Sequence, residues 1–144
     1  MGWIPYFKEE GMSEKEFRVW DKDLKRMFYS AFSITSYGDV IDAGWKEYDH
    51  NTGQMKGGVN CIVMQSMGQE DKIGNVIWEE DIVKHEYEKG VAIVKFGEGY
   101  QGEPADGMYP YWGWYTDGWF DSYAFDGDDV EVVGNIYENP DMVV

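Results

Sequence analysis

The stretch that decides the fold is DIVKHEYEKGVAIVKF, residues 81–96. Its first half, residues 81–87, alternates apolar and polar side chains, which is the pattern of a half-buried β-strand. Residues 91–96 are rich in β-branched side chains and predict a second strand. Between them, Gly90 can adopt the positive φ that a tight turn demands. The sequence therefore predicts an antiparallel β-hairpin with Gly90 at its turn.

Short strands separated by glycine-containing turns extend outward from this hairpin in both directions. Residues 59–64 and 76–78 predict strands before it, with a charged turn at 68–74 between them. After it we expect a loop over 97–107, and a last strand over 130–137 that stops at a proline. Such closely spaced short strands predict an all-β barrel or sandwich.

Residues 13–28 are compatible with two local structures. Ser13 and Glu16 have the spacing of a capping box, which would begin a helix. Phe17 and Val19, however, alternate with charged residues as they would on a strand. We favour a β-hairpin, because aromatic and β-branched residues flank a charged turn at residues 21–25.

Charge is the strongest compositional signal in this chain of 144 residues. Twelve Lys and Arg face 28 Asp and Glu, a formal net charge of −16. From Phe96 to the end there is no Lys or Arg, while the same stretch holds eleven acidic residues. A surface this acidic repels nucleic acid and anionic lipid, so we expect no direct binding to either, and it attracts a basic partner. The alternative is that the charge serves only solubility.

The aromatic stretch 108–125 is the most unusual feature of the sequence. In a strand, Trp112 and Trp114 fall on one face, and Tyr109, Tyr111 and Tyr115 on the other. If one face is core, the other exposes aromatics, as interfaces do. The alternative is that both faces are buried and fill a small barrel.

Catalytic constellations are sparse. Cys61 lies in an apolar strand, where free cysteines are usually buried and inert. His50 and His85 lack the neighbours that a triad or a zinc site would need. The run from Asp126 to Asp129 matches only part of a calcium loop. We therefore expect no enzyme activity, no metal and no cofactor.

Three blocks in order, residues 16–27, 64–83 and 130–141, resemble the YopX family of phage and prophage proteins. The most specific is Gly134-Asn-Ile-Tyr-Glu-Asn-Pro140. The resemblance implies a mainly antiparallel β fold with an SH3-like barrel, a tendency to form homo-oligomers, and no catalytic residues. It also implies a phage gene product in the bacterial host cytoplasm. The first eleven residues are consistent with the expected cytoplasmic location, since they contain neither the basic region nor the apolar run typical of a secretory signal.

Two positions depart from the family's usual pattern. The turn before Asp81 is usually Glu-Gly-Asp, and here its middle residue is Glu80, although a non-glycine residue resists positive φ. The usual Thr-Gly-Leu is here Met67-Gly68-Gln69. In this interpretation an N-terminal β-hairpin and loop lobe covers residues 1–58. The SH3-like barrel covers 59–144 and carries an aromatic, acidic insertion at 97–128.

Our leading hypothesis is a non-enzymatic accessory protein that inhibits a host nucleic-acid-handling or anti-phage defence factor. Its acidic, aromatic face would mimic nucleic acid and occupy a basic groove of that protein. The candidate binding residues are Asp117, Asp121, Asp126, Asp128, Asp129, Trp112, Trp114 and Trp119. One alternative is an oligomeric sponge for a nucleotide immune signal, with tryptophans stacking the base and Arg18, Lys25 or Arg26 binding phosphate. A structural or scaffolding oligomer is the other.

Overall fold

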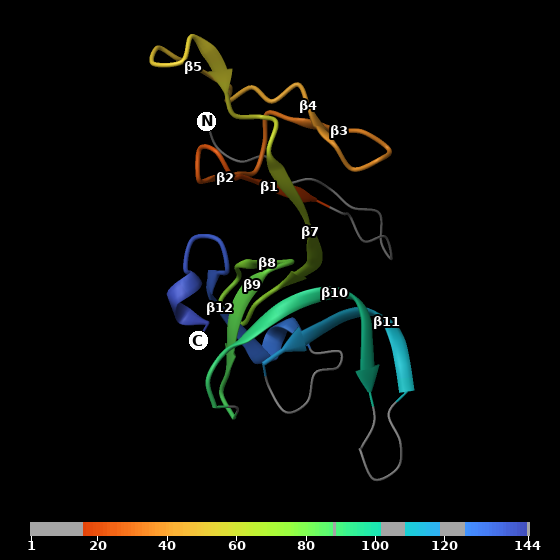
Figure 1. The fold of residues 1–144 in the computed structure, drawn as a ribbon. Helices are drawn as coiled ribbons and strands as arrows, with labels where there is room; N and C mark the ends of the chain where they lie inside the picture. The colour runs from red at the N-terminus through yellow and green to blue at the C-terminus, as the bar shows by residue number, and fades with distance from the viewer. Residues whose placement is uncertain (1–15, 88, 102–108, 119–125, 144) are drawn as a thin grey trace.

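The computed structural model describes residues 16–87, 89–101, 109–118 and 126–143. These residues form two four-stranded antiparallel sheets and two small two-stranded sheets (Figure 1). The predicted mainly β, antiparallel fold is confirmed. The strands are β1 (Phe17–Asp21), β2 (Arg26–Phe28), β3 (Ser33–Ile34), β4 (Val40–Ile41), β5 (Glu47–Asp49), β6 (Gln54–Lys56), β7 (Cys61–Glu70), β8 (Val76–Trp78), β9 (Asp81–His85), β10 (Ala92–Gln101), β11 (Tyr109–Asp117) and β12 (Val130–Asn135). Two short 3₁₀ turns, η1 (Gly127–Asp129) and η2 (Pro140–Met142), complete the described chain.

The first sheet has the strand order β2-β1-β7-β8. The β1–β2 hairpin confirms the strand interpretation of residues 17–28, and the helix alternative is wrong for the described residues from Phe17 on. The hairpin forms because the Asp21 side chain accepts hydrogen bonds from the backbone N–H groups of Asp23 and Leu24, which closes the turn.

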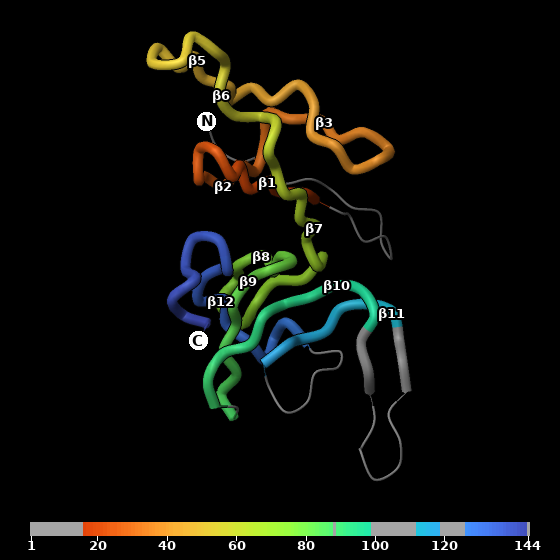
Figure 2. The backbone as a smooth tube through the Cα atoms, viewed as in Figure 1, coloured from red at the N-terminus to blue at the C-terminus, as the bar shows by residue number. Residues whose placement is uncertain are grey.

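The long strand β7 links the upper part of the molecule to the lower part (Figure 2). Its first half pairs with β1 and its second half with β8. The pairing with β8 shifts register between Ser66 and Glu70, and Gly68 within this irregular stretch has φ +79°. The strand therefore runs through Gly68 to Glu70, and the turn that we predicted at residues 68–74 is confined to the residues after Glu70.

The second sheet, β11-β10-β9-β12, curls around the hydrophobic core. The hairpin predicted at residues 81–96 is present as β9 and β10, with Gly90 at φ +76° in its turn. The core is built from both four-stranded sheets, so β8 closes one side of the curl. Its buried members are Ile77, Val83, Ala92, Val94 and Val130. This half-barrel is compatible with the SH3-like detail, which stays a prediction, as does the division at residue 58.

The loop predicted at 97–107 is wrong over residues 97–101, because β10 continues to Gln101. It pairs with β11 through nine residue pairs, from Ile93 opposite Asp117 to Gln101 opposite Tyr109. Gly97 and Gly113 face each other across this ladder with φ of +143° and +157°. Two glycines in conformations that other residues rarely adopt let the hairpin bend there.

Candidate partner-binding site

The exposed turn η1 and its N-cap residue together carry three of the predicted binding residues, Asp126, Asp128 and Asp129. The Asp126 side chain caps the turn by accepting a hydrogen bond from the backbone N–H of Asp128 at 3.0 Å. All three carboxylates belong to exposed residues. The turn therefore presents three negative charges within four residues.

The buried residue Gly127 fixes this turn against the end of β7. Its backbone N–H donates to Gln69 Oε1 at 2.9 Å. A Cβ atom on Gly127 would lie 2.5 Å from the carbonyl oxygen of Glu70, which real Cβ atoms do not tolerate. Gln69 is one of the departures from the family pattern, and a leucine there would offer no acceptor. The acidic turn is thus held on the barrel by a contact that depends on this chain's own residue.

Asp71 holds the neighbouring strand β12 in place. Its buried carboxylate accepts hydrogen bonds from the backbone N–H of Val132 at 2.9 Å and from that of Asn75 at 2.7 Å. Burial alone would raise the pKa of Asp71, but these hydrogen bonds outweigh it and hold the pKa below its ordinary value. Asp71 therefore stays charged at neutral pH.

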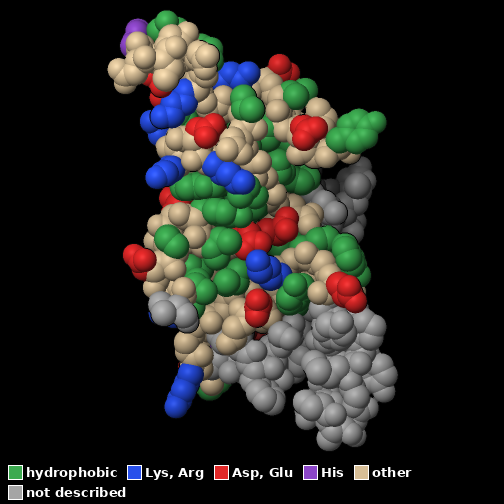
Figure 3. All heavy atoms as spheres, in the orientation of Figure 1, with side chains coloured by type: hydrophobic (Ala, Val, Ile, Leu, Met, Phe, Trp, Pro, Cys, Tyr) green, Lys and Arg blue, Asp and Glu red, His purple; other side chains and the backbone are tan. Residues whose placement is uncertain are grey.

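Lysines near the acidic turn pair with a different carboxylate. Lys72 Nζ and Lys84 Nζ lie 3.9 Å and 3.4 Å from Glu131 Oε2. Within the described residues, no ion pair involves the three aspartates of η1. In the view of Figure 3, most Lys and Arg side chains lie over the upper strands, away from the barrel. The charge on η1 is therefore left for solvent or a partner.

The predicted aromatic face divides into an exposed and a half-buried part. Trp112 is 73% exposed, while Trp114 packs against the hydrophobic core. Phe96 lies beside both, with ring centroids 6.1 Å and 5.1 Å away. Asp117 ends β11 in an exposed position. Trp119 and Asp121 lie outside the described residues.

The structure places one of the proposed phosphate ligands out of reach. Arg18 is buried at 2% exposure, and its Nη2 donates to Asp81 Oδ1 at 2.8 Å and to the Glu79 carbonyl oxygen at 3.0 Å. Its guanidinium also lies over the Trp78 ring at 5.4 Å. Lys25 and Arg26 are exposed, and Arg26 pairs with Glu47. Arg18 therefore cannot bind a ligand's phosphate as we expected.

The Arg18–Asp81 ion pair instead joins β1 of the first sheet to β9 of the second sheet. Asp81 Oδ2 accepts a second hydrogen bond, from the backbone N–H of Trp78 at 2.8 Å. Burial raises the pKa of Asp81 to about 6, against the opposing effect of the Arg18 charge. Beside the pair, the rings of Trp20 and Tyr137 stack at 5.6 Å across the same junction. Sequence reasoning missed this pair, because a charged residue in an alternating strand predicts a solvent-facing side chain.

The structure also describes the surroundings of the single cysteine and of the potential metal ligands. Burial, followed by the Asp21 charge, raises the pKa of the Cys61 thiol to about 11, so the thiol is protonated at neutral pH. No group of three or more His, Cys, Asp or Glu in the described ranges is arranged to hold a metal ion. None of the described helical segments has the length and apolar character that crossing a bilayer requires.

Comparison with known proteins agrees with this architecture. The family model described as YopX protein matches residues 16–143. The structure is similar to the crystal structure of protein EF1440 from Enterococcus faecalis, with a TM-score of 0.56 and 21% sequence identity over 92% of this chain and 100% of that chain. At this identity the likeness shows the fold alone. No curated protein matches the chain.

Proposed function

Because the chain belongs to the YopX family, we propose that it is a phage-type accessory protein that binds a basic surface of a host nucleic-acid-handling or defence protein. It acts by binding and not by catalysis. The observation that carries the proposal is the rigidly held turn η1, which presents Asp126, Asp128 and Asp129 without neutralising lysines among the described residues.

The charge spacing of this turn supports mimicry of nucleic acid. Residues of a 3₁₀ turn advance by about 2.0 Å each along its axis. Duplex DNA carries one charge per about 1.7 Å of axis. Asp128 and Asp129 are adjacent in η1, so the axial rise between these two acidic residues is close to the axial spacing of charges on the duplex. The exposed ring of Trp112 offers apolar area to a partner, as interface hot spots do.

The test is capture of host proteins from nuclease-treated lysate by the tagged chain at low and at high salt. The binding variant is Asp126→Asn/Asp128→Asn/Asp129→Asn, because asparagine keeps the N-cap while removing the charge. The matched control removes three exposed carboxylates elsewhere, in Glu16→Gln/Asp23→Asn/Glu86→Gln.

We expect a basic nucleic-acid-binding protein to be captured at low salt, released by added duplex DNA, and lost in the binding variant only. Capture that both triple variants reduce equally would show that net charge is sufficient and would remove η1 from the proposal. Capture that survives both high salt and the loss of η1 charge would overturn the mimicry.

A further inference from the structure

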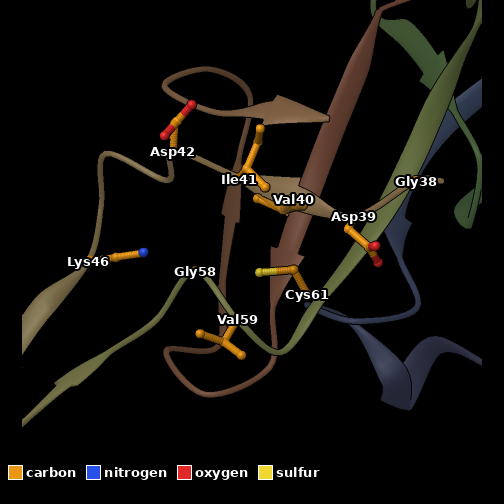
Figure 4. A pocket seen from close by; sticks show the side chains of 9 residues that line it. All are labelled: Gly38, Asp39, Val40, Ile41, Asp42, Lys46, Gly58, Val59 and Cys61. Atoms are coloured by element: carbon orange, nitrogen blue, oxygen red, sulfur yellow. The ribbon is translucent and has the colours of Figure 1, made fainter. Parts of the chain in front are cut away.

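A hollow of about 420 Å³ lies between β4 and the start of β7, among the upper strands. Most of its lining residues are exposed to solvent, and Figure 4 shows the Asp39 carboxylate turned away from the space that Lys46 and Cys61 face. All of the lining residues belong to the range 38–61. The hollow is therefore an open surface feature that is separate from the acidic turn η1.

The acidic turn is closed by hydrogen bonds that stay within it. Asp126 Oδ1 accepts from the backbone N–H of Asp128 at 3.0 Å, and the Asp126 carbonyl oxygen accepts from the N–H of Asp129 at 3.1 Å. The N–H of Val130 donates to the carbonyl oxygen of Gly127. These bonds fix the shape of the turn, but they do not fix its place on the barrel.

Ahead of β12, a single hydrogen bond among the described residues ties η1 to the rest of the fold. It runs from the buried backbone N–H of Gly127 to Gln69 Oε1 at 2.9 Å. The next tie is made by the first residue of β12, Val130, whose carbonyl oxygen accepts from the N–H of Lys72 at 3.0 Å. The position of the acidic turn relative to the barrel therefore depends on Gln69.

The packing around Gly127 shows that the docked turn has one defined position. A Cβ atom on Gly127 would lie 2.5 Å from the Glu70 carbonyl oxygen and 3.0 Å from Ile77 Cδ1. The turn can approach the end of β7 this closely only because residue 127 has no side chain. Gln69 itself is exposed, so replacing its side chain changes this contact without opening the core.

We propose that Gln69 is the positioning residue of the acidic turn: it keeps η1 docked on the end of β7, and the docked turn is the form that binds the partner. This inference rests on the function proposed above. Gln69 carries no charge, so its loss leaves the attraction of the three aspartates for a basic partner intact. A turn that is no longer docked must be ordered again on binding, which weakens a complex chiefly through faster dissociation.

Amide hydrogen exchange followed by NMR tests the docking without any partner. Gln69→Leu removes the acceptor and keeps the net charge, whereas Gln69→Glu keeps an acceptor at the same place. The Gly127 amide should exchange at least about fivefold faster in Gln69→Leu, the value of one typical hydrogen bond, and close to the parent rate in Gln69→Glu. The amide of Val132, which donates to Asp71, should be unchanged in both variants. The control Gln54→Leu replaces an exposed glutamine of β6 and should change neither amide.

Surface plasmon resonance with the host protein that the parent chain captures tests the consequence for binding. The variant is Gln69→Leu/Gly127→Ala, which removes both the acceptor and the space that the docked turn needs. We expect its association rate to stay within about twofold of the parent rate, because all carboxylates are kept, and its dissociation rate to rise at least about fivefold. The charge variant Asp126→Asn/Asp128→Asn/Asp129→Asn should instead lower the association rate.

The possible failures point to different errors. An unchanged exchange rate of the Gly127 amide in Gln69→Leu, or an equal rise at Val132, would show that Gln69 does not dock the turn. Dissociation of the double variant at the parent rate, from a partner that the parent chain does capture, would show that docking has no part in binding. If the parent chain captures no basic protein, the proposed function fails, and the binding role of Gln69 fails with it.

Discussion

Replacing Arg18 with Met tests the ion pair that joins β1 to β9. The side chains of Arg18 and Asp81 are 3% and 2% exposed, so the substitution leaves a carboxylate buried without its counter-ion. Breaking a buried pair in this way costs about 3–5 kcal/mol. Methionine keeps the aliphatic part of the side chain but loses the guanidinium that lies over the Trp78 ring, so part of the loss comes from that contact. At about 3 °C per kcal/mol for a chain of this size, we expect the Tm to fall by roughly 10 °C.

The loss of stability caused by Arg18→Met should grow as the pH rises. The pKa of Asp81 is raised to about 6 by burial, above its ordinary value, so this group favours the folded state at low pH and loses that contribution as pH rises through 6. Without the Arg18 charge the pKa rises further. The free energy of unfolding of Arg18→Met, relative to the parent, should therefore fall between about pH 5 and pH 8. Urea unfolding at both pH values measures it, with the m-value checked for two-state behaviour.

Two further variants decide whether the pair itself is responsible. Arg18→Met/Asp81→Asn removes both charges, and its asparagine can still accept the hydrogen bond from Trp78, so it should recover at least half of the single variant's loss. Lys95→Met breaks the more exposed pair with Glu80 and should cost less than about 1 kcal/mol. A loss under about 1 kcal/mol for Arg18→Met at pH 8, or an equal loss at pH 5 and pH 8, would refute the reasoning.

Three other substitutions test single contacts. Gly127→Ala should cost about 1–3 kcal/mol in thermal unfolding, because its Cβ would lie 2.5 Å from the Glu70 carbonyl oxygen, and an unchanged Tm would contradict that close approach. Asp71→Asn should cost about 1–3 kcal/mol at pH 7, and the difference should shrink as pH falls below 4, because a lowered pKa gives stability that is lost on protonation; a difference that does not change with pH would be inconsistent with this. Glu80→Gly should change stability by less than about 1 kcal/mol, since relief of its φ of +68° offsets the lost pair with Lys95; a loss above about 2 kcal/mol in urea would show that the pair dominates.

Local patterns predicted the parts of the fold that local forces determine. The β9–β10 hairpin and the β1–β2 hairpin were visible in the sequence because alternation, β-branched residues and a turn residue occur within a short window. The loop assigned to residues 97–101 was wrong because Gly97-Glu98-Gly99 has turn composition. The strand conformation of residues 97–101 comes from pairing with β11, whose partner residues lie 8 to 16 positions away in the sequence.

Long-range contacts account for what the sequence could not indicate about the candidate sites. Arg18 pairs with a residue 63 positions away, and Gly127 is held by Gln69 at a separation of 58. Asp21 was recognised as a turn residue, but its hydrogen bond to Gly58 spans 37 residues. Composition and periodicity carry no information about such long-range pairings. A buried charged residue therefore cannot be distinguished from an exposed one in the sequence until the strand topology is known.

The two departures from the family pattern acquire a physical meaning once the contacts are known. Glu80 adopts the left-handed conformation expected of the usual glycine, and its carboxylate holds Lys95 Nζ at 2.9 Å and 3.0 Å, while its backbone N–H donates to Val94. Gln69, in place of a leucine, accepts the hydrogen bond that anchors η1. In both places a residue that weakens the sequence match makes a polar contact that the usual residue could not make. The two departures from the family motif therefore mark contacts that belong to this chain, one that holds Lys95 and one that positions the turn η1.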